Sequence, residues 1–567
     1  MRMINNLKAE PPVFYDNFRH MVAVTGAKYG DKLFAEYDEK GKHKSITYAE
    51  MAENTSAFGA ALYATGLSGK RIALIGDTHP LYLMSYLALL STNSVAIPID
   101  KELSPEQVVS FLRYAEADGV IYTPSMNALF RDPDFDFLSV RIPILPDEAD
   151  VASERLIPLS DMLETGRKAL AAGDTRFQDT ALDMEQCSVL LFTSGTTGTS
   201  HGVMLSHGNL IAALNASTHS MAYDDSATFV SVLPIHHTYE MMCGELGVMA
   251  IGGSMLINDS LKHVLKNFAA YKPTTLILVP LFLETMYKRI WTEARRNGME
   301  KKLRRAMKLS TALLNAGIDR RKKLFGQVIA AFGGNLSSIV CGGAPVNPEI
   351  IKDFYQFGIT VLEGYGITEC APLVSVNSPG KIRFRSVGTP VYGCTVKTDT
   401  EDGISTGEIL VKGPNVMIGY YKDPEATAAA FTEDGFFRTG DIGHIDKDGY
   451  IYLTGRKKNI ILLSNGKNIY PEEIEEYLDD VPLISESVVL GRQKGNAETA
   501  ITAIIVPNME DPALAGKTPS QVYDAIRAAV MAVNRRLPSF KHIADIEIRY
   551  EEFEKNTSRK IKRYLVK

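Results

Sequence analysis

The chain has 567 residues, 45% of them hydrophobic and 23% charged, which is the composition of an ordinary soluble globular protein with room for several cores. Its formal net charge of -6 argues against general nucleic-acid binding. The five cysteines lie far apart in the sequence and do not have the spacing of metal ligands. We therefore expect neither a zinc site nor disulfides, and we expect a cytoplasmic protein.

The N-terminal region contains no good candidate for a signal or a membrane span. Residues 1–18 lack an apolar core, so we do not expect a secretory signal. The apolar stretch from Leu81 to Ile99 is interrupted by Ser, Thr, Asn and Pro98. It therefore predicts a helix followed by a buried strand rather than a membrane helix.

Short apolar runs alternate with amphipathic stretches between residue 71 and about residue 365. This rhythm predicts an α/β fold with mostly parallel sheets covered by helices. The runs are residues 71–76, 95–99, 119–123, 187–192, 228–233, 254–257, 274–279 and 337–343.

The pattern changes twice in the last third of the chain. From Ser386 to Thr454, short β-rich pieces separated by glycines predict a small barrel or a distorted antiparallel sheet. After Gly455 comes a basic joint, RKKN, and then a compact α+β segment with a helix that begins at Pro471. We therefore expect two domains, residues 1–455 and 456–567.

The segment FTSGTTGTSHGV, residues 192–203, is the most informative of the chain. Its glycines let the backbone approach an anion closely, and its Thr and Ser hydroxyls add donors to the backbone amides. Ser206 is a suitable N-cap for a following helix, so we expect a strand, a phosphate-binding loop and a helix. The loop is not a Walker A motif, because it lacks GKS or GKT, and the alternative is a flexible linker.

Two further segments carry polar groups suited to a nucleotide. In LEGYGITEC, Tyr365, Thr368 and Glu369 can present a ring to a base, a hydroxyl to a phosphate and a carboxylate to Mg²⁺. A polar turn between two elements explains this segment alone equally well. In FRTGDIGHID, Asp441 can accept hydrogen bonds from both ribose hydroxyls, or it can bond to its own turn.

Taken together and in this order, these segments resemble the acyl-adenylate-forming superfamily of acyl-CoA synthetases, nonribosomal adenylation domains and luciferases. The resemblance extends from SITYAEM (45–51) to NTSRKIKR (556–563). It implies an N-terminal domain with two helix-covered sheets and a small barrel-like subdomain, followed by a small mobile C-terminal domain. It also implies the use of ATP, Mg²⁺ and CoA.

The resemblance assigns roles to residues of the N-terminal domain. Tyr365, beside Gly366, would stack on adenine, Thr368 would contact the α-phosphate, and Glu369 would bind Mg²⁺ together with Thr196. His237, in LPIHHTYE, would line the acyl and adenylate site, whereas we expect His236 to be a packing or surface residue. The phosphate loop would be Thr193, Ser194, Gly195, Thr196, Thr197, Gly198 and Gly202, and the adenine wall would be Gly342, Gly343 and Ala344.

The resemblance also assigns roles around the C-terminal domain. Asp441 and Arg456 would hold the ribose and phosphate, and Lys458 would be the hinge on which the domain swings between two half-reactions. Gly466 would lie beside the pantetheine of CoA, and Lys560 would bridge the carboxylate and the α-phosphate. A basic, solvated tail is the alternative interpretation of the segment around Lys560.

The chain departs from the family pattern at two places. Where the phosphate loop usually continues with Pro-Lys-Gly, this chain has Ser200, His201 and Gly202. Near the C-terminus, Arg559 stands before Lys560 where the family usually has glycine. A homologue that binds nucleotide or acyl groups but has weakened catalysis is therefore one alternative function.

Residues 288–325 hold thirteen Lys or Arg and three Asp or Glu, opposite in sign to the whole chain. The solvent-exposed face of a surface helix explains these charges. A basic amphipathic region can also contact the inner, cytoplasmic surface of an anionic membrane. An insertion here resembles the long-chain fatty acid branch of the acyl-CoA synthetases. We therefore expect a fatty acid–CoA ligase, or alternatively a ligase that loads an acyl carrier protein. The sequence does not determine the length of the acyl chain or the oligomeric state of the protein.

Overall fold

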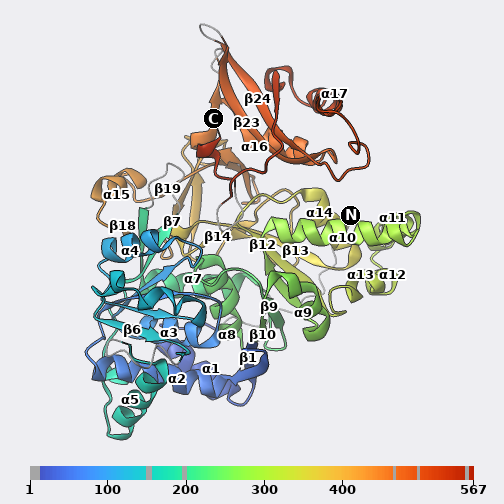
Figure 1. Ribbon diagram of the computed structural model, residues 1–567. Coiled ribbons are helices and arrows are strands. Elements are labelled where there is room, and N and C mark those ends of the chain that lie inside the picture. The colour runs from blue at the N-terminus through green and yellow to red at the C-terminus, as the bar shows by residue number, and fades with distance from the viewer. Residues whose placement is uncertain are drawn as a thin grey trace. The chain divides into compact units, whose positions relative to one another are not determined.

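The computed structural model describes residues 13–147, 156–193, 201–221, 223–463, 468–494, 498–555 and 561–566. These residues form two compact units (Figure 1). Unit 1 holds the described residues up to 193, together with 201–395 and 412–431. Unit 2 holds residues 396–411 and the described residues from 432 onward.

The larger sheet of unit 1 has nine strands in the order β15-β14-β13-β12-β11-β9-β10-β1-β2. The six strands from β13 to β1 run parallel, and the pairs at the two ends are antiparallel. β11 and β12 are buried along their whole length, as expected for strands covered on both faces. The strands are β1 (Leu33–Glu39), β2 (Lys42–Thr47), β9 (Thr228–Ser231), β10 (Ser254–Ile257), β11 (Thr275–Leu278), β12 (Ser338–Gly342), β13 (Thr360–Gly366), β14 (Leu373–Val376) and β15 (Thr389–Pro390).

The second sheet of unit 1 has seven strands in the order β18-β8-β7-β4-β3-β5-β6. The five strands from β7 to β6 are parallel, and β8 and β18 are antiparallel additions at one edge. The strands are β3 (Arg71–Ile75), β4 (Val95–Ile99), β5 (Gly119–Tyr122), β6 (Val140–Pro143), β7 (Cys187–Thr193), β8 (His201–Ser206) and β18 (Gly419–Tyr420). The two mostly parallel sheets confirm the fold class expected from the alternating apolar runs.

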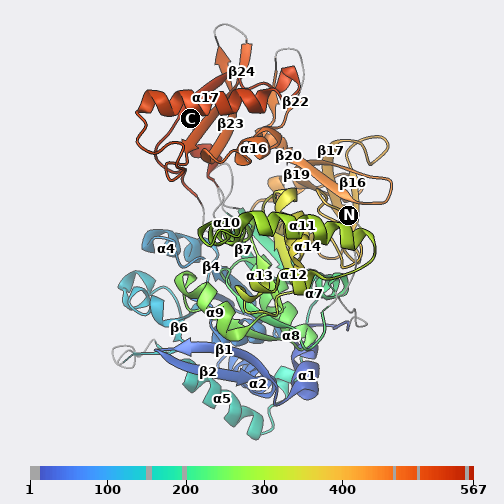
Figure 2. The same cartoon turned by 90° about the vertical axis from the view of Figure 1, so that its right-hand side faces the viewer.

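Helices cover both sheets. α3 packs on β3, β4, β5 and β7, and α2 packs on α1, α3 and α5 (Figure 1). α7 contacts β7 and β8 of one sheet and β14 of the other, so it joins the two sheets. α10, α11 and α14 lie together (Figure 2). Of these helices, α10 contacts β12 and α14 contacts β13.

The helices of unit 1 are α1 (Phe18–Tyr29), α2 (Tyr48–Ala64), α3 (Pro80–Leu90), α4 (Pro105–Tyr114), α5 (Leu159–Ala171), α6 (Arg176–Asp179), α7 (His207–Ser220), α8 (Gly247–Ile251), α9 (Val264–Tyr271), α10 (Pro280–Arg296), α11 (Glu300–Asn315), α12 (Arg321–Leu324), α13 (Gly326–Ala330), α14 (Pro348–Phe357) and α15 (Pro424–Ala430). The stretch from Leu81 forms α3 and then β4, as predicted. Within the described ranges, every helix is too short or too polar to cross a membrane.

Unit 2 contains a four-stranded sheet and an α+β segment. The four-stranded sheet has the order β16-β17-β19-β20, antiparallel where β19 meets its two neighbours. In the α+β segment, α16 and α17 share an apolar core with β23 and β24. The elements are β16 (Thr395–Thr398), β17 (Gly407–Lys412), β19 (Phe437–Ile445), β20 (Ile451–Arg456), β21 (Ile461–Leu462), β22 (Asn468–Ile469), α16 (Pro471–Asp479), β23 (Ile484–Lys494), β24 (Glu498–Pro507), α17 (Pro519–Asn534) and β25 (Asp545–Ile548).

Candidate nucleotide site

The glycine- and hydroxyl-rich segment follows β7, but the next element is a strand and not a helix. β7 and β8 form an antiparallel pair in which Phe192 faces Gly202 and Thr193 faces His201. Ser206 caps α7 through a capping box with Asn209, as predicted, but it lies at the far end of β8. The expected order of strand, loop and helix is therefore wrong, because β8 stands between the segment and α7.

Several predicted residues lie beyond the described ranges. Thr193 is described only as the last backbone position of β7, and Gly202 lies in β8 opposite Phe192. The predicted residues outside the described part of the chain are Ser194, Gly195, Thr196, Thr197, Gly198, Gly466 and Lys560.

Three other predicted segments meet at one edge of the nine-stranded sheet. β13, β12, β11 and β9 are adjacent and parallel, so the loops after them share the carboxyl edge, where α/β proteins bind ligands. His237 follows β9, Gly343 and Ala344 follow β12, and Thr368 and Glu369 follow β13. Tertiary pairing thus brings together residues up to 132 positions apart in the sequence.

Two of the residues predicted to form the wall of the adenine pocket are exposed to solvent. The ring of Tyr365, which is predicted to stack on adenine, is buried. Gly343 and Ala344 are exposed, and Gly343 has a φ of +89°, which favours glycine. Gly342 pairs with Gly364 in β13, next to Tyr365, whose side chain is 6% exposed. Backbone and ring therefore lie on neighbouring strands at the same edge.

The turn after β13 is tightly built. Thr368–Cys370 form one 3₁₀ turn, and the backbone N–H of Ile367 donates to Pro372 O at 2.8 Å. A Cβ on Gly366 would lie 2.3 Å from the same Pro372 oxygen, so only glycine fits there. The turn leaves the side chains of Thr368 and Glu369 half-buried.

The donor set of this turn fits a hard cation such as Mg²⁺. Glu369 Oε1 accepts a hydrogen bond from the Tyr420 hydroxyl at 3.2 Å, and no other described residue donates to the carboxylate. Among the described residues, no group of three His, Cys, Asp or Glu side chains could hold a metal alone. A cation at Glu369 would therefore need further oxygens, which the phosphates of a nucleotide can supply.

The two histidines after β9 differ in environment. The side chain of His236 is only 10% exposed, its Nε2 lies 3.7 Å from Asp100 Oδ2, and desolvation lowers its pKa to about 4. His237 is half-buried, with its ring 4.2 Å from that of His236, and its backbone leads into the π-helix Tyr239–Leu246. His236 is therefore a packing residue, one of the two options expected.

His201, which replaces the family's usual lysine, has an acidic and an aromatic neighbour. Its Nδ1 lies 3.4 Å from Asp423 Oδ2, and its ring centroid lies 5.0 Å from that of Tyr420. Since Tyr420 contacts Glu369, His201 belongs to the same polar region as the predicted cation ligand.

Unit 2 contains the remaining predicted residues. Asp441 in β19 faces Arg456 in β20, with Arg456 Nε 2.7 Å from Asp441 Oδ1. Asp441 is 6% exposed. Partial desolvation, followed by the charge of Arg456, lowers the pKa of Lys458 to about 8. These three residues therefore form one local group.

Sequence reasoning missed Asn415 and Tyr420, which contact the turn around Glu369. Asn415 donates to two backbone oxygens of the turn, and Tyr420 donates to Glu369 itself. Nothing in the motif LEGYGITEC signals these partners, because they lie in a distant, β-rich part of the sequence.

Comparison with known proteins agrees with this geometry. The pattern of the AMP-binding enzyme family matches residues 22–421, and that of the AMP-binding enzyme C-terminal domain matches residues 458–567. The chain belongs to the AMP-binding enzyme family. This confirms the resemblance stated above, and the family that it names typically uses ATP, Mg²⁺ and CoA.

Relatives of known function are similar over most of their length. The long-chain-fatty-acid–CoA ligase FadD15 of Mycobacterium bovis is 29% identical, over 80% of this chain and 76% of its own. The long-chain-fatty-acid–[acyl-carrier-protein] ligase AEE15 of Arabidopsis thaliana is 27% identical, over 88% of this chain and 78% of its own. Among solved structures, ATP-bound MatB from Rhodopseudomonas palustris has a TM-score of 0.74 and 25% identity, over 97% of this chain and 98% of its own.

Proposed function

We propose that this enzyme activates a long-chain fatty acid with ATP and transfers the acyl group to CoA. The observation that carries the proposal is the strand edge that gathers Ala344, Tyr365, Thr368 and Glu369 in a chain of the AMP-binding enzyme family. The fatty acid is proposed from the similarity to long-chain-fatty-acid–CoA ligases.

In the first half-reaction, a carboxylate oxygen of the fatty acid attacks the α-phosphorus of ATP. A P–O bond forms to the acyl group, and the bond to pyrophosphate breaks, which leaves acyl-AMP. Tyr365 would orient the base, Thr368 would contact the α-phosphate, and Asp441 with Arg456 would hold the ribose. Mg²⁺, when bound at Glu369, neutralises charge on the phosphates.

In the second half-reaction, the thiolate of CoA attacks the acyl carbonyl and AMP leaves. We propose that residues 456–567 form the domain that moves between the two steps, with Lys458 as the hinge. Lys560 would serve the first step only, and Gly466 would line the path of pantetheine in the second. Separate poses keep the acyl-adenylate away from water.

Exchange of labelled pyrophosphate into ATP tests the first half-reaction. We expect exchange only when a fatty acid is added, and then AMP release when CoA is added. A panel of acids from acetate to long-chain and aromatic acids would define the acyl group. ATP binding without fatty-acid-dependent exchange would support the alternative of a homologue with weakened catalysis.

An acyl carrier protein is the second candidate acceptor, because one relative is named as an acyl-carrier-protein ligase. CoA and an acyl carrier protein both present a phosphopantetheine thiol, but the thiol is attached to a nucleotide in CoA and to a protein in the carrier. Comparing thioester formation with CoA and with a purified acyl carrier protein decides between them.

We also propose loose contact with an anionic membrane through α10, α11 and α12. Twelve of the thirteen cationic side chains of residues 288–325 are exposed, together with Leu309 and Ile318. The exception is Arg321, which is buried and bound to Asp319 and to the backbone oxygen of Tyr355. Exposed cations beside exposed apolar side chains suit the interface of an anionic bilayer.

A further inference from the structure

The backbone of the turn that carries Glu369 is held by residues 415–417. Asn415 Nδ2 donates to the backbone oxygens of Cys370 at 3.0 Å and of Leu373 at 2.8 Å, and Met417 N donates to Glu369 O at 2.8 Å. Asn415 is 1% exposed, and its Oδ1 accepts from Cys394 Sγ at 3.0 Å. Both hydrogen bonds that this buried amide donates therefore go to the backbone around the turn, and its oxygen is held by Cys394.

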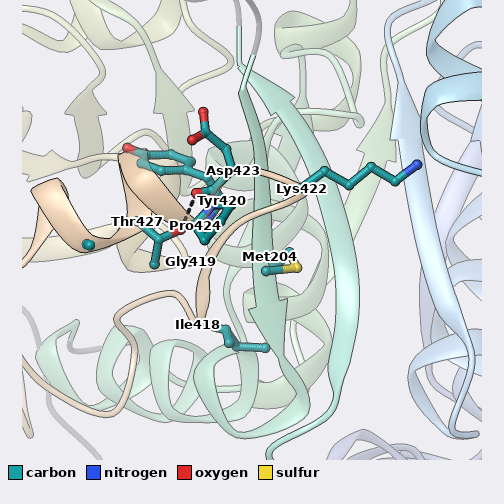
Figure 3. Close-up of a pocket in the computed structure, with 9 residues that line it drawn as sticks. Met204, Ile418, Gly419, Tyr420, Lys422, Asp423, Pro424 and Thr427 are labelled. Carbon is teal, nitrogen blue, oxygen red and sulfur yellow. Dashed lines mark hydrogen bonds between the residues drawn. The ribbon is translucent and has the colours of Figure 1, made fainter.

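The side chain of Glu369 is held by the next strand of the same segment. Tyr420 lies in β18, opposite Val203 of β8, and its hydroxyl donates to Glu369 Oε1 at 3.2 Å. The backbone N–H of Tyr420 donates to Thr427 Oγ1 at 2.8 Å, which fixes the start of the side chain. In Figure 3, Tyr420 and Asp423 lie on one side of this segment, and Lys422 extends the other way.

The hydroxyl of Tyr420 is placed as a donor to the carboxylate of Glu369. A neutral phenol donates one hydrogen bond, which orients a carboxylate without neutralising it.

We propose that Tyr420 is a positioning residue for the cation that accompanies ATP: its hydroxyl holds Oε1 of Glu369 so that Oε2 faces the ion. The inference rests on the nucleotide-binding function proposed above. Carboxylates that bind metals are commonly oriented by such outer hydrogen bonds, and their loss typically weakens metal binding by about 10-fold to 100-fold.

The substitution Tyr420→Phe removes this hydroxyl and nothing else. Tyr421→Phe is the matched control, because the Tyr421 hydroxyl contacts Arg71 and Glu116 instead of the turn. Mn²⁺ replaces Mg²⁺ as the probe, since electron paramagnetic resonance measures the free ion. The full-length proteins, in excess over a non-hydrolysable ATP analogue, are titrated with Mn²⁺, and a titration of the analogue without protein is the reference.

We expect Tyr420→Phe to raise the dissociation constant of Mn²⁺ by about 10-fold or more and Tyr421→Phe to change it by less than about 2-fold. Equal constants in the two variants would overturn the positioning role and leave the proposed function intact. Wild-type protein that binds no Mn²⁺ with the analogue would contradict the nucleotide site itself, and this inference with it.

Pyrophosphate exchange supplies the second readout. In Tyr420→Phe, the Mg²⁺ concentration for half-maximal exchange should rise, while the rate at saturating Mg²⁺ stays within about 2-fold of the wild type. A purely structural defect would lower the saturated rate and leave the Mg²⁺ dependence unchanged, which would count against the proposal.

Discussion

Two carboxyl groups, those of Glu240 and Glu245, are buried in the π-helix Tyr239–Leu246, and each residue is 1% exposed. Ser231 Oγ donates to Glu240 Oε1 at 2.5 Å. The other three carboxyl oxygens accept from no donor within the described residues. Burial raises the pKa of both groups, that of Glu245 to about 7, so the folded protein favours their protonated forms.

This shift predicts the pH dependence of stability. Because the folded state binds a proton at Glu245 that the unfolded state releases, the free energy of unfolding should fall as pH rises from about 4.5 to about 7. Glu245→Gln should remove the part of this loss that Glu245 contributes, so the variant gains stability relative to wild type toward pH 8, by at most about 3 kcal/mol. Urea unfolding at pH 5, 6, 7 and 8 measures the difference.

The exposed Glu433 offers a control for this experiment. Glu433→Gln should leave the slope of stability against pH as in the wild type. If Glu245→Gln shows that same slope, Glu245 is ionised in the folded protein and the prediction is wrong.

At the residue scale, short motifs predicted the groups that we propose act on a nucleotide, but not the groups that hold them. Thr368 and Glu369 were predicted because their types and spacing suit phosphate and metal. Asn415 and Tyr420 were missed because their role arises only from contact across the fold. The burial of Arg321 within a run of exposed cations also depends on a tertiary partner, the backbone of Tyr355.

At the element scale, α11 is the helix best suited to test membrane contact. Lys301, Arg305 and Lys308 are exposed on it, beside Leu309, which is 50% exposed. Reversing all three charges to Glu should weaken binding to anionic vesicles by at least about 10-fold, because each surface cation contributes about 1 kcal/mol. Co-sedimentation with vesicles of phosphatidylcholine and phosphatidylglycerol measures the bound fraction.

A second triple variant carries the same change of net charge elsewhere. Lys42 in β2, Lys447 between β19 and β20, and Lys517 before α17 are exposed and lie outside α10 to α12, so their reversal to Glu should have a much smaller effect. Equal losses in the two variants would mean that only net charge matters and that α10 to α12 form no membrane surface.

The element after the predicted phosphate loop shows where local patterns fail. HGVMLS has four buried residues in six, but the sequence predicts no strand between the loop and the helix capped by Ser206. Pairing with β7 makes it a strand, because the edge of the seven-stranded sheet offers hydrogen bonds that local sequence does not reveal. Strands inside the parallel sheets were predicted well, because burial on both faces leaves a continuous apolar run.

At the scale of the whole molecule, the two half-reactions should respond differently to one substitution. Lys560→Ala should abolish fatty-acid-dependent pyrophosphate exchange, because the proposed cation beside the α-phosphate is lost. It should largely spare thioester formation from supplied acyl-AMP, since the proposed domain movement removes Lys560 before that step. The two rates are measured separately on the same preparation.

Lys562→Ala is a neighbouring control that removes a partly exposed lysine paired with Glu554. Both half-reactions should persist in it. Equal loss of the two half-reactions in Lys560→Ala would refute the role assigned to that lysine.

The sequence by itself determined the α/β class, the family, the order of the motifs and the chemical types in the site. These properties depend on local composition and spacing, which a chain carries before it folds. Only the tertiary structure decided which strands share a carboxyl edge, that β8 is a strand, and that Asn415 and Tyr420 hold the turn around Glu369. Those contacts join residues distant in the chain, and their energies exist only once the sheets have formed.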